Sequence, residues 1–243
     1  MKIKLGGIMD SSTLDYPNQL SSVIYLWGCP FRCPWCHNPE LVIGKEYNEI
    51  DILELILKLK ENYMVDAISI TGGEPLMQES TIELLKNLKE TTNFKIKIDT
   101  NCFFPNQLEK ALLYLDRIAI DIKAPFNKYC KAVGREININ NIKECHSLLK
   151  NWDKPIEVRT TIVPGINDTT DDIKEIASIV NEMGAEMFVL QQFRPDKTLD
   201  PSYRNITSPS HEQMKTLGEA AKRLLANIKV IIVTTEKGFE EIA

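Results

Sequence analysis

Hydrophobic and polar positions alternate with two different periods along this chain. Helices are predicted at about 49–62, 79–91, 106–115, 139–150, 170–183 and 210–226, and the apolar residues of 52–59 and 82–88 recur at helical spacing. Short runs rich in β-branched residues predict strands at 22–27, 66–71, 94–99, 117–122, 156–162, 186–192 and 228–234. Strand–helix units that repeat in this way favour parallel strands with right-handed crossovers, and therefore an α/β fold.

Several of the predicted strands have one apolar and one polar face. Ile96 and Ile98 alternate with Lys95, Lys97 and Asp99, and the strands at 66–71, 117–122 and 156–162 alternate in the same way. Parallel strands covered on both faces usually read as continuous apolar runs. A solvated edge explains one such strand, but four favour a polar lumen that holds a ligand. We predict a partial (β/α)6 barrel of the TIM type, with parallel strands, an open lumen and a C-terminal extension.

Length and composition are those of an ordinary globular protein. The 243 residues are 43% hydrophobic and 26% charged. We expect one domain over residues 1–243, with a core at about 20–192 and an extension at about 193–243. Within the extension, residues 193–201 form a polar, proline-bounded loop that is a candidate lid.

Charge and hydropathy exclude some classes of partner. A net charge of −5 argues against a general binder of nucleic acid or membrane surfaces. The first ten residues lack the apolar core of a secretion signal, and no apolar run approaches the ~18 residues of a membrane span. We therefore expect a cytoplasmic protein with neither nucleic acid nor membrane as its partner.

Three cysteines are grouped directly after the first predicted strand. Cys29, Cys33 and Cys36 stand in the sequence C-P-F-R-C-P-W-C. Three thiolates on one short loop can hold a metal centre, one ligand short of the usual four. A four-iron cluster held in this way has one iron open, and an open position usually serves chemistry. The other three cysteines show no ligand spacing and are expected to be ordinary thiols: Cys102, Cys130 and Cys145.

Polar groups follow the carboxyl ends of the predicted strands. The second strand ends in Thr71-Gly-Gly-Glu-Pro75, whose glycines let the backbone approach a ligand closely. The next strands end in Asp99-Thr-Asn101 and Asp121-Ile-Lys123, and the fifth carries Arg159. Ligands bind at this edge of parallel α/β folds, on the same side as the cysteine loop.

Taken together, these residues closely resemble the radical S-adenosylmethionine (SAM) superfamily. The matching motifs are C-x3-C-x-aromatic-C at 29–36, with Trp35 as the aromatic residue, and G-G-E-P at 72–75. Further segments resemble one group within the superfamily, the activating enzymes of glycyl radical enzymes. These segments are Thr13–Pro17, Cys36–Glu40, Asp99–Asn101, Asp121–Lys123, Arg159 and Val163–Gly165. Within that group the chain is most similar to activating proteins of anaerobic ribonucleotide reductase that are related to pyruvate formate-lyase activase. The resemblance covers about residues 5–193.

The resemblance implies a role for each matching residue. Cys29, Cys33 and Cys36 would hold a [4Fe-4S] cluster whose open iron chelates SAM. The implied contacts to SAM are Trp35, Gly72, Gly73, Glu74, Asp99, Asn101, Asp121, Lys123 and Arg159. A monovalent cation beside the SAM carboxylate would be held by Asp99, Thr100, Asp121 and the carbonyl of Ala119. Such a cation would offset repulsion between carboxylates, and Lys123 could share that role.

The resemblance also implies the reaction. Reductive cleavage of SAM gives a 5′-deoxyadenosyl radical, which takes hydrogen from a glycine Cα of a partner glycyl radical enzyme. The implied partner is an anaerobic ribonucleotide reductase or a pyruvate formate-lyase-like enzyme, and the implied electron donor is of the flavodoxin or ferredoxin type. Cys102 stands where these activases commonly have glycine. No second cysteine group lies between residues 36 and 66, which indicates the single-cluster kind.

Two alternatives remain open. The first is a radical SAM enzyme acting on a small molecule, similar to the deazaguanine-forming synthase. The second is a structural zinc module with His37 as a fourth ligand, although adjacent residues such as Cys36 and His37 seldom both reach one tetrahedral metal. The remaining histidines, His146 and His211, fall in predicted helices, where we expect surface or helix-end positions.

Overall fold

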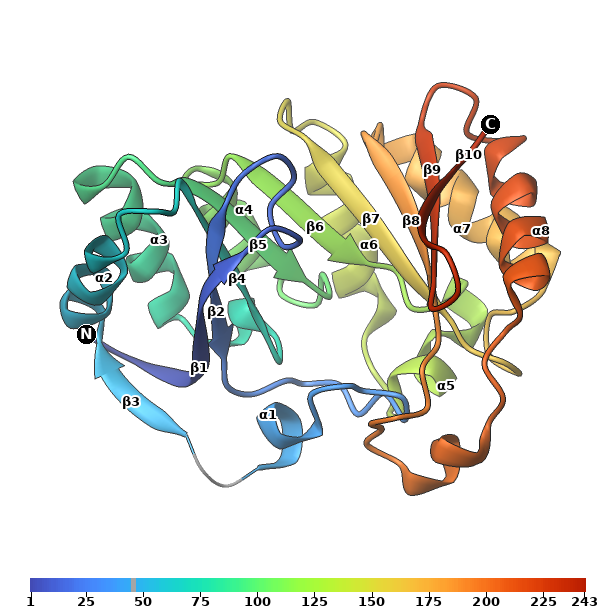
Figure 1. The fold of residues 1–243 in the computed structure, drawn as a ribbon, viewed down its shortest axis with the longest axis horizontal. Helices are drawn as coiled ribbons and strands as arrows, with labels where there is room; N and C mark the ends of the chain where they lie inside the picture. Colours follow the sequence, from blue (N-terminus) through green and yellow to red (C-terminus); the bar gives the residue numbers. More distant parts are fainter. Residues whose placement is uncertain (45–46) are drawn as a thin grey trace. The chain divides into compact units, whose positions relative to one another are not determined.

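The structure is a computed structural model that describes residues 1–44 and 47–243 (Figure 1). The chain divides into two compact units. The first comprises Met1–Pro30 and Asn38–Ala119, and the second comprises Phe31–His37 and Ile120–Ala243. Strand β6 (Arg117–Asp121) begins in the first unit and ends in the second. The expectation of one functional domain over the whole chain stays a prediction.

In the first unit the strand order is β5-β4-β2-β1-β3. The neighbours β2, β4 and β5 are parallel, whereas β1 is antiparallel to both β2 and β3. The strands are β1 (Lys2–Ser12), β2 (Ser21–Leu26), β3 (Asn48–Asp51), β4 (Ala67–Gly72) and β5 (Lys95–Thr100). The helices are α1 (Pro39–Ile43), α2 (Ile52–Glu61), α3 (Ser80–Thr91) and α4 (Pro105–Leu112), with a 3₁₀ helix at Pro75–Met77.

In the second unit the strand order is β10-β9-β8-β7. β7, β8 and β9 are parallel, and β10 returns antiparallel to β9. These strands are β7 (Ile156–Ile162), β8 (Met187–Gln192), β9 (Lys229–Thr234) and β10 (Gly238–Ile242). The helices are α5 (Tyr129–Val133), α6 (Ile139–Leu149), α7 (Thr170–Met183) and α8 (His211–Lys222), with 3₁₀ helices at Phe126–Lys128 and Pro201–Asn205.

The expected α/β fold with mostly parallel strands is confirmed. All seven predicted strands are present, and each lies within one residue of its predicted limits. Among the described residues, β3 pairs only with β1 and β10 pairs only with β9, so each unit keeps a free sheet edge rather than a closed barrel. β9 extends the parallel strands beyond residue 193, within the segment that the sequence treats as an extension.

The prediction of a helix from residue 49 is wrong at its start. Residues 48–51 form β3, and α2 begins only at Ile52. The side chain of Asp51 accepts a hydrogen bond from the Leu53 N–H at 2.9 Å and thereby caps the helix. The residues before this cap are extended and pair with β1. β1 and β10 were not predicted, because most of their side chains are exposed or half-buried and leave a weak pattern.

Polar side chains on β4, β5 and β7 are buried, not solvated. The side chains of Lys97 and Ser69 are completely inaccessible, and Glu157 is almost so. Burial of polar groups is costly unless they are paired, so these positions must be satisfied within the protein or by a ligand. The solvated-edge interpretation therefore does not hold for these strands.

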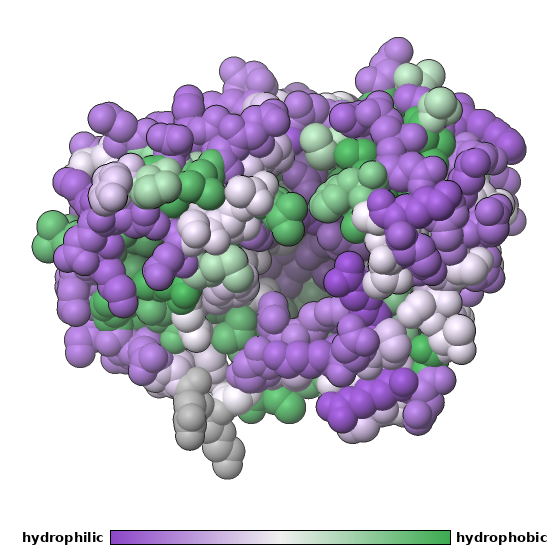
Figure 2. Space-filling model, viewed as in Figure 1, coloured by the Kyte–Doolittle hydropathy of each residue, from purple (hydrophilic) through white to green (hydrophobic). Residues whose placement is uncertain are grey.

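The face of the molecule drawn in Figure 2 is mainly hydrophilic. Figure 2 shows hydrophilic side chains over most of the visible face, with hydrophobic ones in separate smaller groups. Over residues 1–44 and 47–243, no helix combines the length and the apolar character needed to cross a bilayer.

Candidate functional site

The residues predicted to form the site divide between the two units. The first unit holds Cys29, Gly72, Gly73, Glu74, Asp99, Thr100, Asn101 and Ala119. The second unit holds Cys33, Trp35, Cys36, Asp121, Lys123 and Arg159. The two groups are built in different ways.

In the first unit, the glycine turn after β4 lies directly against the start of the cysteine loop. The Glu74 N–H donates to the Gly28 carbonyl at 2.7 Å. A Cβ on Gly73 would lie 2.1 Å from the Gly28 oxygen and 3.2 Å from the Cβ of Cys29, so only glycine fits there. Gly72 has a φ of +127°, which other residues rarely adopt. Gly73 is therefore needed for the close contact at Gly28 and Cys29, whereas Gly72 is needed for its own backbone conformation and its close approach to Leu26.

Glu74 ties the end of β4 to the end of β5. Its side chain is completely buried, and its carboxylate accepts hydrogen bonds from Thr100 Oγ1 at 2.7 Å and Asn101 N at 2.7 Å. A third bond comes from Leu76 N at 3.0 Å. Charge-assisted bonds of this kind are among the strong ones. The carboxylate thus holds protein groups in place, and its expected contact to SAM stays a prediction.

Asn101 connects this network to Cys29. Its Nδ2 donates to the Sγ of Cys29 at 3.7 Å. Its Oδ1 is buried and has no hydrogen-bond partner within the described part of the chain. Buried acceptors are normally satisfied, so this oxygen suits an N–H donor from a ligand. The next residue, Cys102, has a φ of +58°, the left-handed conformation that favours glycine. That conformation accounts for the glycine common in activases at this position.

Lys97 is a charged residue of this region that no motif in the sequence marks as part of the site. Its Nζ pairs with Asp99 Oδ1 at 2.5 Å, and the Lys97 side chain is fully buried while Asp99 is 13% exposed. Burial, with the negative charges of Asp15 and Asp99, raises the pKa of nearby Tyr25. The spacing of Lys97 and Asp99, two apart on one strand face, is the sequence signal that could have identified the pair.

In the second unit, an ammonium group accompanies two cysteines. Lys123 Nζ lies 3.0 Å from Asp121 Oδ2. Burial raises the pKa of the Cys33 thiol to about 12, while the positive charge of Lys123 opposes that rise. Burial also disfavours the charge on Lys123, but Asp121, Cys33 and Cys36 hold the pKa of Lys123 above its usual value. Lys123 therefore stays protonated beside both cysteines and favours their thiolate forms.

Trp35 packs against a segment that lies beyond the predicted core. Its side chain is buried, and its ring centroid lies 6.4 Å from that of Tyr203. Next to it, the Asp200 N–H donates to the Pro34 carbonyl at 2.9 Å. The segment after β8 thus contacts the cysteine loop, although its motion as a lid stays a prediction. No motif in the sequence pointed to Tyr203.

Arg159 and His37 lie among other charged groups of the second unit. Arg159 Nε pairs with Glu157 Oε1 at 2.5 Å, and the Arg159 carbonyl accepts from Ile122 N at 2.9 Å. Burial, followed by the positive charge of Arg194, lowers the pKa of His37. His37 is therefore close to the loop after β8.

Within the described residues, no group of three His, Cys, Asp or Glu side chains is close enough to hold a single metal ion. In a four-iron cluster each cysteine binds a different iron, so its ligands stand farther apart than those of one ion.

Comparison with known proteins identifies the class. A model of the radical SAM superfamily matches residues 23–180, more than half of the chain. The chain belongs to the radical SAM superfamily. It is therefore an enzyme of the radical SAM type, and the family implies a [4Fe-4S] cluster and SAM as cofactors. The parallel α/β fold described above agrees with this membership.

Relatives confirm the resemblance to activating enzymes. A protein of Methanocaldococcus jannaschii, provisionally named a glycyl-radical enzyme activating enzyme, is 36% identical over 256 residues, covering 99% of this chain and 100% of the relative. The pyruvate formate-lyase-activating enzyme of Clostridium pasteurianum is 26% identical over 91% of this chain and 98% of its own length.

A solved structure shows the same fold. A domain of a pyruvate-formate lyase-activating enzyme from Bacteroides vulgatus superposes with a TM-score of 0.56 and 19% identity, over 69% of this chain and 99% of that one. At this identity the likeness concerns the fold alone.

Proposed function

We propose that this enzyme is a radical SAM activase, which cleaves SAM reductively and abstracts hydrogen from a glycine Cα of a partner glycyl radical enzyme. The observation that carries the proposal is the 36% identity to a relative of that name over 99% of the chain. The relatives named for pyruvate formate-lyase add to it. An anaerobic ribonucleotide reductase or a pyruvate formate-lyase-like enzyme is the proposed partner, with a flavodoxin or ferredoxin as electron donor.

In this proposal Cys29, Cys33 and Cys36 bind the cluster. When bound, a [4Fe-4S] cluster supplies one electron to SAM and coordinates its amino and carboxylate groups. The donor set fits, because Asn101 donates to the Cys29 sulfur and Lys123 favours the thiolates of Cys33 and Cys36. Sulfur ligands that accept hydrogen bonds and lie beside a positive charge are typical of such centres.

The proposed SAM contacts have complementary chemistry. The buried Oδ1 of Asn101 is an acceptor for the amino group of SAM. The turn Gly72–Glu74 fixes the backbone there through the carboxylate bonds of Glu74. The further contacts that we propose in the second unit are Trp35, Asp121, Lys123 and Arg159.

The charges around the two aspartates support one change to the expected cation site. Asp99 has Lys97 as a partner at 2.5 Å, and Asp121 has Lys123 at 3.0 Å. Each carboxylate is thus neutralised by an ammonium group of its own unit, and we propose that these lysines do what a bound cation would otherwise do. A monovalent ion at Asp99, Thr100, Ala119 and Asp121 stays a prediction. Replacing potassium and sodium by choline tests it, because an ion-dependent site would lose SAM affinity.

The first experiment is an anaerobic reconstitution with iron and sulfide, followed by dithionite and SAM. We expect 5′-deoxyadenosine and methionine in equal amounts, and neither product with Cys33→Ala. Bound zinc without SAM cleavage would contradict the proposal and favour the structural zinc module.

A second experiment separates a protein substrate from a small molecule. The glycyl radical enzymes of the source organism are prepared with glycine deuterated at Cα and mixed with the reduced enzyme and SAM. Deuterium in 5′-deoxyadenosine, with a glycyl radical signal in electron paramagnetic resonance, is the expected result. Cleavage of SAM without deuterium transfer from any of these proteins would favour the small-molecule alternative.

A further inference from the structure

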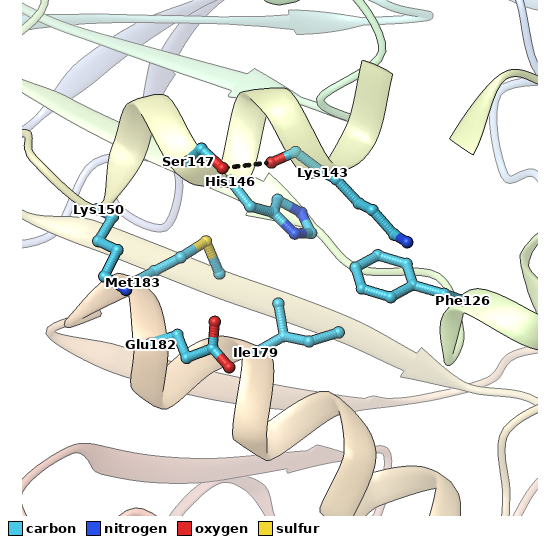
Figure 3. Close-up of a pocket in the computed structure, with 8 residues that line it drawn as sticks. All are labelled: Phe126, Lys143, His146, Ser147, Lys150, Ile179, Glu182 and Met183. Carbon is cyan, nitrogen blue, oxygen red and sulfur yellow. Dashed lines mark hydrogen bonds between the residues drawn. The ribbon is translucent and has the colours of Figure 1, made fainter. Parts of the chain in front are cut away.

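A cavity of about 280 Å³ lies in the second unit, lined by residues from α6, α7 and the 3₁₀ helix at Phe126–Lys128 (Figure 3). Its inner wall is apolar or aromatic and includes Phe126, Ile179 and Met183. Its rim is polar and includes Lys143, Ser147, Lys150 and Glu182, all of them exposed. The residues proposed for SAM and the cluster do not line it, so its occupant is a separate question.

His146 is an unusual component of this wall. Its ring extends from α6 toward α7 in Figure 3, and only 7% of the residue is exposed. Both ring nitrogens are buried and have no hydrogen-bond partner among the described residues. His146 lies in the last turn of α6, as the expected helix-end position requires, but it is buried and not on the surface. Two unsatisfied nitrogens on one buried ring are costly and require an explanation.

The protonation state of His146 defines what it offers. Burial lowers the pKa of His146 to about 4, so the imidazole is neutral at physiological pH. A neutral imidazole has one N–H donor and one acceptor nitrogen. Its ring centroid is 6.0 Å from that of Phe126, so one edge of the cavity is aromatic.

The rim carries more positive than negative charge. Lys143 and Lys150 supply two ammonium groups, against the single carboxylate of Glu182. Lys143 Nζ lies over the Phe126 ring, 5.1 Å from its centroid, and thus at the entrance to the apolar wall. Ser147 Oγ is already used, because it donates to the Lys143 carbonyl at 3.0 Å. The lining therefore favours a ligand with one negative charge.

We propose that this cavity binds a small monocarboxylic acid with an apolar, planar body. The body lies against Phe126, Ile179 and Met183, and the carboxylate accepts from the His146 N–H and pairs with Lys143 or Lys150. The volume is near the lower end of ligand pockets, roughly 300 Å³, which fits a single ring and excludes a nucleotide. Methionine adapts to differently shaped apolar ligands. The inference is independent of the activase proposal, because it uses none of that site's residues.

The test uses the full chain, loaded with its cluster, and benzoate as the probe. The chain has only three histidines, so ¹⁵N-histidine labelling gives three sets of ring signals, and His146→Phe identifies the set of interest. We expect millimolar benzoate to shift the His146 ring signals while those of His37 and His211 stay fixed. Calorimetry should show that benzoate binds. Benzyl alcohol, the uncharged analogue, should bind at least about tenfold more weakly than benzoate.

Two variants probe the two parts of the site. His146→Phe should abolish benzoate binding and leave the chain folded, since phenylalanine fills the same space. Lys143→Met with Lys150→Met, at exposed positions that do not threaten folding, should weaken benzoate at least about tenfold and leave benzyl alcohol unchanged. Lys174→Met is the matched control, because Lys174 on α7 is exposed and pairs with Asp171 at 2.9 Å.

Three results would overturn the proposal. One is the absence of any change in the His146 signals at millimolar benzoate. Another is equal affinity for benzoate and benzyl alcohol, which would remove the carboxylate from the recognition. The third is equal loss of benzoate binding in Lys174→Met and in the Lys143/Lys150 double variant, which would make the effect one of general charge.

Discussion

Cys29 in the first unit and Cys33 with Cys36 in the second have different surroundings. Cys29 lies against backbone and a neutral amide: Gly73 approaches its Cβ, and Asn101 donates to its sulfur. Cys33 and Cys36 lie beside the ammonium group of Lys123. Packing and hydrogen bonds fix the first cysteine, whereas burial and charge govern the other two.

The difference predicts different sensitivities to mutation. When one partner of a buried hydrogen bond or a close packing contact is removed, the free energy of unfolding falls by several kcal/mol. A partly exposed charge contributes less to stability, but it changes the electrostatic potential at a nearby centre. Changes in the first unit should therefore affect folding most, and changes at Lys123 should affect the properties of the bound cluster.

The largest effect is expected from the cysteines themselves. Alanine at Cys29, Cys33 or Cys36 should abolish cluster binding and SAM cleavage, because each removes one of three ligands. Cys145→Ala is the control, since Cys145 is fully buried in α6 and should leave iron content intact. Iron and sulfide analysis measures cluster binding, and the yield of 5′-deoxyadenosine measures SAM cleavage. Full iron retention in any of the three would remove that cysteine from the cluster.

The next effect compares the two lysines. Lys97→Met should lower the free energy of unfolding by about 3 kcal/mol, because it removes the fully buried ammonium partner of the Asp99 carboxylate. Lys123→Met should cost about 1 kcal/mol, since Asp121 is 35% exposed. It should instead make the cluster harder to reduce, because a positive charge is lost beside its ligands.

Urea unfolding and redox titration measure these two quantities. Lys97→Met combined with Asp99→Asn should recover part of the lost stability, since the double variant also removes the negative charge that Lys97 balances. Equal stability losses at Lys97 and Lys123 would remove the contrast between the units.

A smaller loss is expected at Glu74. Glu74→Gln replaces an acceptor oxygen by an amide nitrogen and leaves a buried donor on Thr100, Asn101 or Leu76 unpaired, at a cost of about 2 kcal/mol. Glu79→Gln is the matched control, because Glu79 is exposed and caps nothing, and it should stay within about 0.5 kcal/mol. Urea unfolding of both variants measures these two losses of stability. A neutral Glu74→Gln would mean that the carboxylate does not organise this end of the strands.

The smallest effect on stability is expected at Tyr203, in the segment after β8 that contacts the cysteine loop. Tyr203→Ala removes an aromatic neighbour of Trp35 and should cost about 1 kcal/mol, whereas Tyr203→Phe keeps the ring and should cost almost nothing. Thermal unfolding distinguishes the two. Equal losses would show that the Tyr203 hydroxyl, and not the ring contact, matters.

The sequence by itself determined the strand positions, the parallel α/β class and the motifs of the radical SAM superfamily. These features are local: alternation reports a strand, and a short motif such as the one at Cys29–Cys36 is read from adjacent residues. The sequence pattern places the start of α2 too early, because Ile52 and the residues before it carry similar apolar spacing. Only the cap formed by Asp51 and the pairing with β1 separate strand from helix there.

Only the tertiary structure decided how the polar residues are used. The sequence predicts Glu74 as a ligand contact, and the structure adds that its carboxylate accepts hydrogen bonds from Thr100, Asn101 and Leu76. The alternation in the sequence places Lys97 on the polar face of its strand, but only the structure shows that it is fully buried and paired with Asp99. His146 looks like a helix-surface residue, yet both of its nitrogens are buried. Partners and burial depend on segments far apart in the chain, and no local pattern records which of them meet.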